Sequence, residues 1–208
     1  MKELETTGQS SDILRQVDEF FMKTGPVQQT LRNITERLSE TEIDYVVIEG
    51  MALALHGLIR PTQDVDLLLT ASGLKEFQAR FVGLGYVPTF VGVQKHFRDT
   101  DTGVKVEIIT TGEYPGDGQP KAIAFPDPAE VAVVVDGFRV ARLDTLIELK
   151  LASGMSAKHR ELRDLADVQQ LIEVLRLPED FSRNLDDSVR DEYRRLWKLA
   201  QYAKTSDL

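Results

Sequence analysis

The chain of 208 residues carries 34 acidic and 25 basic side chains, a formal charge of -9, and no cysteine. This length fits one domain, or one domain with a helical appendage, and the lack of thiols excludes disulfide bonds and cysteine-ligated zinc. The acidic balance disfavours indiscriminate binding to nucleic acid, because phosphate backbones attract basic surfaces, but it leaves room for a local basic patch.

The first forty residues are predicted to form two helices that cover one face of a sheet. The first would run from Ser11 or Asp12 to Met22, and the second from Pro26 to about Ser39. The polar start of the chain lacks the apolar segment of a signal peptide, and no later run reaches the length of a membrane span. We therefore expect a cytoplasmic protein with no membrane partner.

The segment 45–70 is predicted to form a strand, a glycine turn, a short apolar helix and a second strand. The first strand covers Tyr45 to Ile48, the turn lies at Gly50, and the second strand carries Asp64 and Asp66. Residues two apart on a strand share a face, so both carboxylates point the same way while their apolar neighbours enter the core. Like charges held so close would retain a proton unless a divalent cation lies between them. Oxygen ligands suit Mg²⁺ or Mn²⁺.

Further strands and helices follow at regular intervals. The predicted strand Val104–Thr110 carries Glu107 on the face opposite Val104, Val106 and Ile108. Residues 112–120 form a loop rich in glycine and proline. The predicted elements are a helix from Gly73 to Leu84 capped by Ser72, a strand from Tyr86 to Val91, a hairpin of Lys95–Asp99 with Val104–Thr110, and a hairpin of Val131–Val135 with Phe138–Ala141.

From Leu143 onward the pattern is helical. We expect helices at 143–151, 158–175 and 187–202, separated at Gly154 and Pro178. The predicted organisation is an α/β (α+β) domain over 1–141 with a mixed sheet flanked by helices, and a helical subdomain over 142–208 packed on it.

The individual signals are weak, since an aspartate pair on a strand is common, but their order is more specific. Gly50-Met51-Ala52-Leu53-Ala54-Leu55-His56-Gly57 is followed by Arg60-Pro61-Thr62-Gln63-Asp64-Val65-Asp66, and then by Lys150, Arg160, Arg163-Asp164 and Asp167. Over about residues 43 to 172 this pattern resembles the nucleotidyltransferase superfamily with a polymerase-beta-like palm, and in particular its AbiEii-like branch of toxins from toxin–antitoxin systems.

The resemblance implies two-metal phosphoryl transfer from an NTP. The metal ligands would be Asp64, Asp66 and Glu107, and Lys150 would join them in catalysis. The residues implied in nucleotide binding are Gly50, Met51, Arg60, Thr62 and Arg160. Arg60 and Thr62 could instead orient the carboxylates or fix the loop. Gly50 would let backbone N–H groups approach the triphosphate at a helix N-terminus.

Two departures and several structural alternatives accompany this assignment. Met51 stands where the family has Gly or Ser, and its bulk would weaken triphosphate binding; Glu107 replaces the commoner aspartate. Lys150 and Arg160 would equally be solvated on amphipathic helices. Asp164 and Asp167 could pair with Arg160 or Arg163 at helical spacing. We interpret His56 as a hydrogen-bonding residue outside catalysis.

These readings leave three hypotheses. The first is a toxin that transfers NMP to an RNA, such as tRNA, or to a protein hydroxyl, with an antitoxin as partner. The second is a catalytically weakened nucleotidyltransferase fold that acts as a nucleotide-binding or scaffold module, as Met51 suggests. The third, a purely structural helical protein, leaves the strand carboxylates unexplained.

Overall fold

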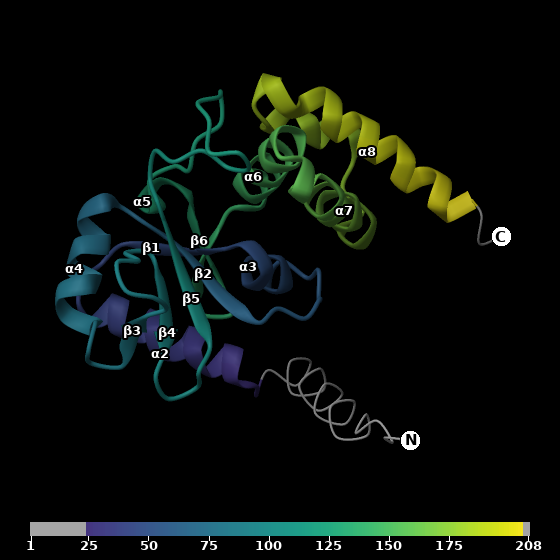
Figure 1. Ribbon diagram of the computed structural model, residues 1–208. Helices are drawn as coiled ribbons and strands as arrows, with labels where there is room; N and C mark the ends of the chain where they lie inside the picture. Colours follow the sequence, from purple (N-terminus) through teal and green to yellow (C-terminus); the bar gives the residue numbers. More distant parts are fainter. Residues whose placement is uncertain (1–23, 206–208) are drawn as a thin grey trace, which may run out of the picture.

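The computed structural model describes residues 24–205, and the helix expected at 12–22 lies outside this range. A seven-stranded mixed sheet runs through the molecule in the order β3-β4-β5-β2-β1-β7-β6 (Figure 1). Its strands are β1 (Tyr45–Ile48), β2 (Asp64–Leu69), β3 (Tyr86–Pro88), β4 (His96–Asp99), β5 (Lys105–Thr110), β6 (Ala132–Val135) and β7 (Phe138–Ala141). The predicted α/β class with a mixed sheet and flanking helices is confirmed.

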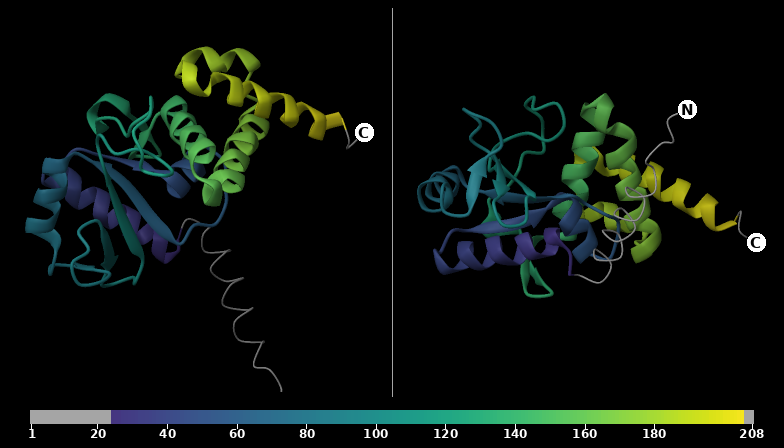
Figure 2. Two further views of the ribbon diagram at one scale, coloured as in Figure 1. Left: turned by 45° about the horizontal axis from the view of Figure 1, so that its top comes forward. Right: turned by 60° about the horizontal axis from the view of Figure 1, so that its bottom comes forward.

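Some helices flank this sheet, and the last three helices lie together at one end of it (Figures 1 and 2). The helices are α2 (Pro26–Glu40), α3 (Glu49–Leu55), α4 (Ala71–Phe81), α5 (Pro128–Val131), α6 (Leu143–Ser156), α7 (Lys158–Leu175), the 3₁₀ turn η1 (Glu179–Asn184) and α8 (Asp187–Thr205). The predicted boundary at Ala141 falls between the end of β7 and the start of α6. No helix within residues 24–205 is both long and apolar enough to cross a membrane.

The middle of the sheet has a register that decides where polar side chains meet. Strand β2 pairs antiparallel with β1 and parallel with β5, and Asp66 lies beside Glu107 in the parallel pair. Val65 and Val106, the in-register neighbours on the opposite face, are buried. One face of β2 and β5 is therefore apolar and the other carries carboxylates, as the alternation of side chains predicts.

Helices α2 and α4 pack against the apolar face, and Figure 2 shows α2 running along the sheet. In α4, Phe77 is fully buried, with its ring centroid 5.0 Å from that of Phe97 and 5.4 Å from that of Tyr86. Offset and tilted aromatic pairs of this kind add to the free energy gained from burial. This cover leaves only the opposite face open to ligands.

Several predicted boundaries were wrong for local reasons. Helix α4 is capped by Thr70, whose hydroxyl accepts a hydrogen bond from the Gly73 N–H, rather than by Ser72. The helix ends at Phe81, which leaves Leu84 67% exposed. Strand β3 ends at Pro88, three residues earlier than expected, because the chain turns into a loop there.

Helix α6 continues through Gly154 instead of breaking there. A Cβ at this position would lie 2.8 Å from Cδ2 of Leu165 on α7. The glycine thus allows α6 and α7 to approach closely and does not end a helix. Nine residues of α6 are buried.

Candidate active site

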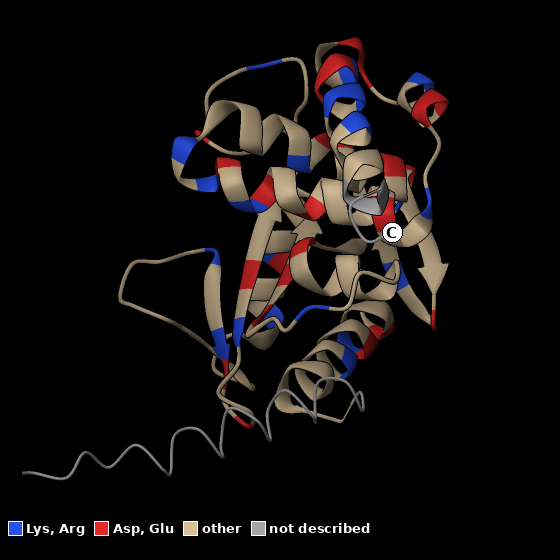
Figure 3. Ribbon diagram, turned by 90° about the vertical axis from the view of Figure 1, so that its right-hand side faces the viewer, with Lys and Arg blue, Asp and Glu red and all other residues tan. Residues whose placement is uncertain are grey.

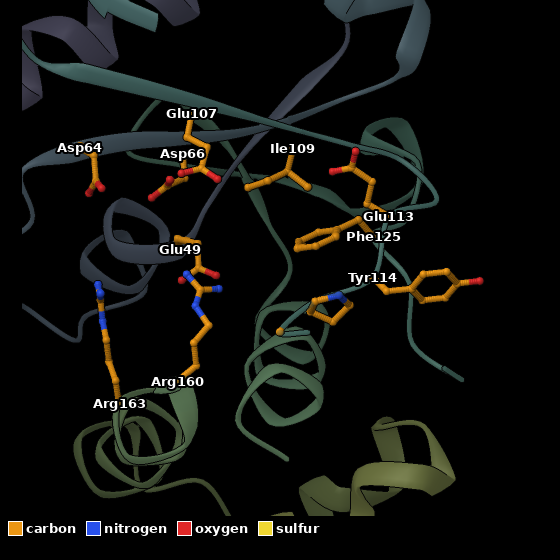
Figure 4. Close-up of a pocket in the computed structure, with 12 residues that line it drawn as sticks. Glu49, Asp64, Asp66, Glu107, Ile109, Glu113, Tyr114, Phe125, Arg160 and Arg163 are labelled. Atoms are coloured by element: carbon orange, nitrogen blue, oxygen red, sulfur yellow. The ribbon is translucent and has the colours of Figure 1, made fainter. Parts of the chain in front are cut away.

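Three carboxylates project from the polar face of the sheet. Asp64 and Asp66 lie on β2 and Glu107 lies on β5, and Figure 4 shows all three directed into the same cavity. The in-register parallel pair places Asp66 directly beside Glu107. The sequence prediction that these three residues come together is therefore consistent with their placement around one cavity.

The cavity has a volume of about 230 Å³ and is closed on its far side by α7. Arg160 and Arg163 reach across from this helix towards Glu49 and the strand carboxylates (Figure 4). Within residues 24–205 neither guanidinium group has an ion-pair partner. The remaining wall comes from the loop after β5, with Glu113, Tyr114, Pro115 and Gly116, and from Ile109 and Phe125. Acidic and basic groups thus face each other across a small space.

The carboxyl group of Asp66 is buried close to three other acidic side chains. Burial raises its pKa well above the usual value, and the charges of Glu49, Asp64 and Glu107 raise it further. Within the described part of the chain its side chain forms no hydrogen bond or ion pair. A buried anion without a partner either holds a proton or binds a cation.

The donor set at this site suits a hard divalent cation, because it offers only carboxylate oxygens and an excess of negative charge. In the arrangement described for residues 24–205, however, no group of three or more His, Asp or Glu side chains could hold a metal ion. Asp64, Asp66 and Glu107 have the chemistry for Mg²⁺ or Mn²⁺, but their side chains would have to turn towards the ion to bind it.

The part of Gly50 in nucleotide binding stays a prediction, and the structure gives this glycine a packing role. It lies inside α3 and does not line the cavity, and a Cβ on it would come within 2.7 Å of the Thr62 hydroxyl oxygen. That hydroxyl donates a hydrogen bond of 2.8 Å to Oδ1 of Asp64. The absence of a side chain at Gly50 therefore leaves room for Thr62 to orient Asp64, a candidate metal ligand. The residue with a left-handed backbone conformation at this turn is Glu49, whose φ is 53°.

Met51 was predicted to contact the nucleotide, and the structure places its side chain elsewhere. The side chain is 4% exposed and belongs to the hydrophobic core, and the residue does not line the cavity. The bulk of this methionine therefore does not narrow the space in which a triphosphate would lie.

Lys150 is buried, not solvated on the surface of its helix. Its ammonium group forms ion pairs with Glu49, with Asp164 at 2.9 Å and with Asp167 at 3.1 Å, and its side chain is 1% exposed. Burial lowers the pKa of Lys150, but the three carboxylates outweigh burial and the pKa is raised. Since Glu49 also lines the cavity, Lys150 acts on the site by holding Glu49 in place, not by lining the cavity itself.

The same network includes Arg60, Asp164 and Asp167. Arg60 donates a hydrogen bond of 3.0 Å to Oδ2 of Asp167 and does not line the cavity. Asp164 accepts hydrogen bonds from Lys150 and from the Ser153 hydroxyl, so neither aspartate pairs with the arginines on its own helix. The helical spacing was compatible with such pairs, but α7 turns these carboxylates inward, towards α6.

His56 has the structural role expected of it. Its Nε2 lies 2.8 Å from the carbonyl oxygen of Ala141, which ties the end of α3 to the end of β7. It takes no part in lining the cavity.

Sequence reasoning missed Glu49 and Arg163 as site residues. Glu49 directly precedes the expected glycine turn, and nothing in its neighbourhood distinguishes it from a solvated turn residue. Arg163 follows Arg160 by three residues, which puts both on one helical face. That spacing was the available signal, and it would have identified a basic pair.

No family model matches the sequence, and no curated protein sequence matches it significantly. Among solved structures, a candidate nucleotidyltransferase from Thermotoga maritima is similar at 23% identity and a TM-score of 0.49, over 67% of this chain and 91% of that one. An antigenic nucleotidyltransferase-like protein from Paracoccidioides brasiliensis is similar at 14% identity and a TM-score of 0.46, over 71% and 75% of the two chains.

The antibiotic-resistance factor ANT(2'')-Ia, in complex with adenylyl-2''-tobramycin, is similar at 11% identity and a TM-score of 0.48, over 90% of this chain and 98% of that one. These likenesses are too distant to assign a family or a substrate, and the AbiEii-like branch stays a prediction. The chain is similar in structure to proteins described as nucleotidyltransferases.

Proposed function

We propose that this protein transfers a nucleoside monophosphate from an NTP to a hydroxyl group, with Mg²⁺ or Mn²⁺ as cofactor. One observation carries the proposal: three strand carboxylates face two arginines without ion-pair partners, among the described residues, across one cavity. Phosphoryl transfer needs this division of charge, with anionic ligands for a cation on one side and cationic groups for phosphate oxygens on the other.

The residues on each side have separate tasks in this scheme. Arg160 and Arg163 bind the phosphate oxygens of the NTP, for which the planar guanidinium group is well shaped. Asp64, held by Thr62, and Asp66 with Glu107 bind the cation. When bound, a divalent cation neutralises charge on the phosphates and lowers the pKa of the acceptor hydroxyl.

The bonds made and broken follow from this placement. The acceptor oxygen forms a bond to the α-phosphorus of the NTP, and the bond from that phosphorus to the oxygen bridging to the β-phosphate breaks. Pyrophosphate leaves, and the hydroxyl proton passes to Glu107 or to solvent. Glu107 suits this task because its side chain is 43% exposed and can exchange protons with water.

We further propose an RNA, such as tRNA, or a protein hydroxyl as the acceptor, and a role as the toxin of a toxin–antitoxin pair. The motif order from Gly50 to Asp167, which resembles the AbiEii-like branch, supports this finer assignment. A cytoplasmic location would suit such a target.

The test is incubation with each labelled NTP, Mg²⁺, and either total RNA or cell extract, using the wild type and Asp64→Ala. We expect label in one acceptor fraction with the wild type only, and relief of growth inhibition by the substitution. Asp44→Ala, a change in a carboxylate that pairs with Arg139 on the surface, is the matched control and should retain transfer. Equal transfer by wild type and Asp64→Ala would contradict the proposal.

A second candidate is a nucleotide-binding module that has lost turnover. It is favoured by one observation: within residues 24–205 no three or more His, Asp or Glu side chains are already arranged to hold one metal ion. Calorimetry that detected Mg²⁺-dependent NTP binding, together with no transfer to any RNA or extract, would select this candidate.

A further inference from the structure

A second groove, of about 410 Å³, opens on the other side of the strand carboxylates. It is lined by residues of β4 and β5 and by the loop between β3 and β4, and it shares Asp64 and Glu107 with the candidate active site. No other residue lines both spaces. The two carboxylates thus stand between a cavity that faces the arginines of α7 and a groove that faces the edge of the sheet.

The strand register arranges charge across this face in rows. Asp64 lies beside Lys105, and Lys105 lies opposite Arg98 in the next strand; the neighbouring row consists of Asp66, Glu107 and His96. Figure 3 shows the same change of sign, with red on the middle strands and blue on β4, which follows the long loop, and at the start of β5. The polar face is therefore acidic at β2 and basic at β4 and the start of β5.

Strand pairing holds two basic side chains side by side in the groove. Lys105 and Arg98 sit directly opposite each other on antiparallel strands, where like charges destabilise the sheet. Arg98 donates a hydrogen bond to the carbonyl oxygen of Gly103, and neither side chain has a carboxylate partner within residues 24–205. Such a pair, retained in a chain of charge -9, is suited to an anionic ligand.

An exposed aromatic side chain completes the groove. Phe90 is 75% exposed although it lines the groove, and Val87, beside Arg98 in the sheet, is 40% exposed. The loop that carries Phe90 is anchored at both ends, by the Thr89 N–H to the His96 carbonyl and by the Gln78 side chain to the Gln94 carbonyl. A flat apolar ring on an anchored loop offers a surface on which a base can stack.

We propose that this groove, with Lys105, Arg98 and Phe90, binds the end of a single-stranded RNA whose terminal hydroxyl is the acceptor. Cationic groups that follow a phosphate backbone, next to an aromatic ring for a base, are the combination used to bind single strands. A peptide lacks the regular negative charge that the basic pair requires. The inference rests on the proposed function, because it assigns the acceptor of the same reaction.

The position of the groove also fits the geometry of the transfer. In phosphoryl transfer the attacking and leaving oxygens lie roughly in line on opposite sides of the phosphorus. An NTP held by Arg160 and Arg163 would approach the carboxylates from one side, and an RNA end in the groove would approach from the other. The acceptor hydroxyl would then lie at Asp64 and Glu107, the two residues common to both spaces.

The test separates binding from transfer. A fluorescently labelled single-stranded RNA with a free 3′ end is titrated against the full chain, and its anisotropy is followed at several salt concentrations. We expect Lys105→Glu/Arg98→Glu to weaken binding at least tenfold and to reduce the slope of log affinity against log salt by about 1.4, since each phosphate contact on a single strand contributes about 0.7. Lys75→Glu/Lys198→Glu changes the net charge equally at two exposed sites outside both spaces, and should leave the affinity almost unchanged.

The aromatic residue is tested by a second pair of variants. Phe90→Leu keeps an apolar side chain but loses the ring, and we expect about tenfold weaker RNA binding, whereas Phe90→Tyr should bind like the wild type. In the transfer assay, the two groove variants Lys105→Glu/Arg98→Glu and Phe90→Leu should raise the KM for RNA and leave the KM for NTP unchanged.

The outcomes distinguish the inference from the proposed function. RNA binding that the groove variants abolish, without transfer by the wild type, upholds the groove and removes the proposed transferase. Transfer to RNA with a KM that the groove variants leave unchanged, or transfer to protein that the RNA does not inhibit, overturns the groove and keeps the transferase. RNA binding unaffected by either set of variants also overturns the inference.

Discussion

Two groups of carboxylates lie close together in this protein and differ in how their charges are balanced. Around Lys150, the carboxylates of Glu49, Asp164 and Asp167 each contact a cationic side chain, and Arg60 adds a second positive charge. On the strands, Asp66 has no ion-pair partner among the described residues, although it is 8% exposed.

The difference separates a group that holds the fold from a group prepared for a ligand. A buried ion pair with complete partners keeps helices in a fixed relation, while a buried anion without partners lowers stability until a cation or proton arrives. Glu49 belongs to both groups, since it contacts Lys150 and lines the cavity. The following predictions test this division, from the largest expected effect to the smallest.

The largest effect is expected from Lys150→Met. Removing the cation leaves the buried carboxylates of Asp164 and Asp167, and the partly exposed Glu49, without their common partner, which typically costs about 3–5 kcal/mol of unfolding free energy. Urea unfolding followed by circular dichroism measures it. Lys158→Met, at an exposed lysine at the start of α7, is the control and should change the free energy by less than about 0.5 kcal/mol. A loss no greater than that of the control would show that the network does not hold the helices together.

The next effect is expected on substrate binding. Arg163→Ala removes a guanidinium group from the cavity wall, and a lost hydrogen bond to a charged group costs about 1.5–3 kcal/mol. We expect the KM for NTP to rise about 10- to 100-fold and the unfolding free energy to stay within about 0.5 kcal/mol. Arg176→Ala, at the end of the same helix, should have neither effect. An unchanged KM would place the triphosphate elsewhere.

A smaller effect is expected from Gly50→Ala. The added methyl group would press on the Thr62 side chain, and overpacking typically costs about 1–3 kcal/mol. Since Thr62 holds Asp64, we expect a lower kcat as well as lower stability. If Gly50 acts through Thr62, adding Gly50→Ala to Thr62→Ala should lower kcat little further, because the hydroxyl that orients Asp64 is already absent. A further fall as large as that caused by Gly50→Ala alone would separate Gly50 from Asp64.

The smallest effect has the opposite sign. Asp66→Asn removes a charge that burial and three neighbouring carboxylates disfavour, so we expect a melting temperature about 2–4 °C higher, equal to about 1 kcal/mol, in metal-free buffer. The same variant should lose Mg²⁺ binding and transfer. An isosteric change at a surface carboxylate, Asp44→Asn, should leave the melting temperature and transfer nearly unchanged.

The pH dependence follows from the raised pKa of Asp66. Because the folded protein holds this proton more tightly than the unfolded chain, stability falls as pH rises from the ordinary aspartate pKa to the raised folded value, and is constant above it. Melting curves of wild type and Asp66→Asn across this window should differ most at its upper end. A difference that is greatest at low pH would contradict the assignment.

Parts of the site were predictable because they depend on local rules. Alternation along β5 put Glu107 on the face away from Val106 and Ile108, and the spacing of Asp64 and Asp66 put them on one face of β2. The turn at Asp136 and Gly137, both with positive φ, was likewise evident from its residues. Each of these predictions needs only a short stretch of chain.

Other parts depend on packing between distant segments and could not be predicted. The partners of Lys150 come from two helices, α3 and α7, and its distance in sequence from Glu49 is 101 residues. The inward direction of Met51 and the capping of α4 by Thr70 follow from which neighbours compete for the same space. A single sequence contains no record of that competition.

By itself, the sequence determined which residues can carry charge on one face of a strand and which segments form strands and helices, because side-chain periodicity and turn chemistry act over a few residues. Only the tertiary structure decided which charges are balanced. It enclosed Lys150 among carboxylates, left Asp66 without a partner among the described residues, and set Lys105 opposite Arg98, because these relations arise where strands pair and helices pack.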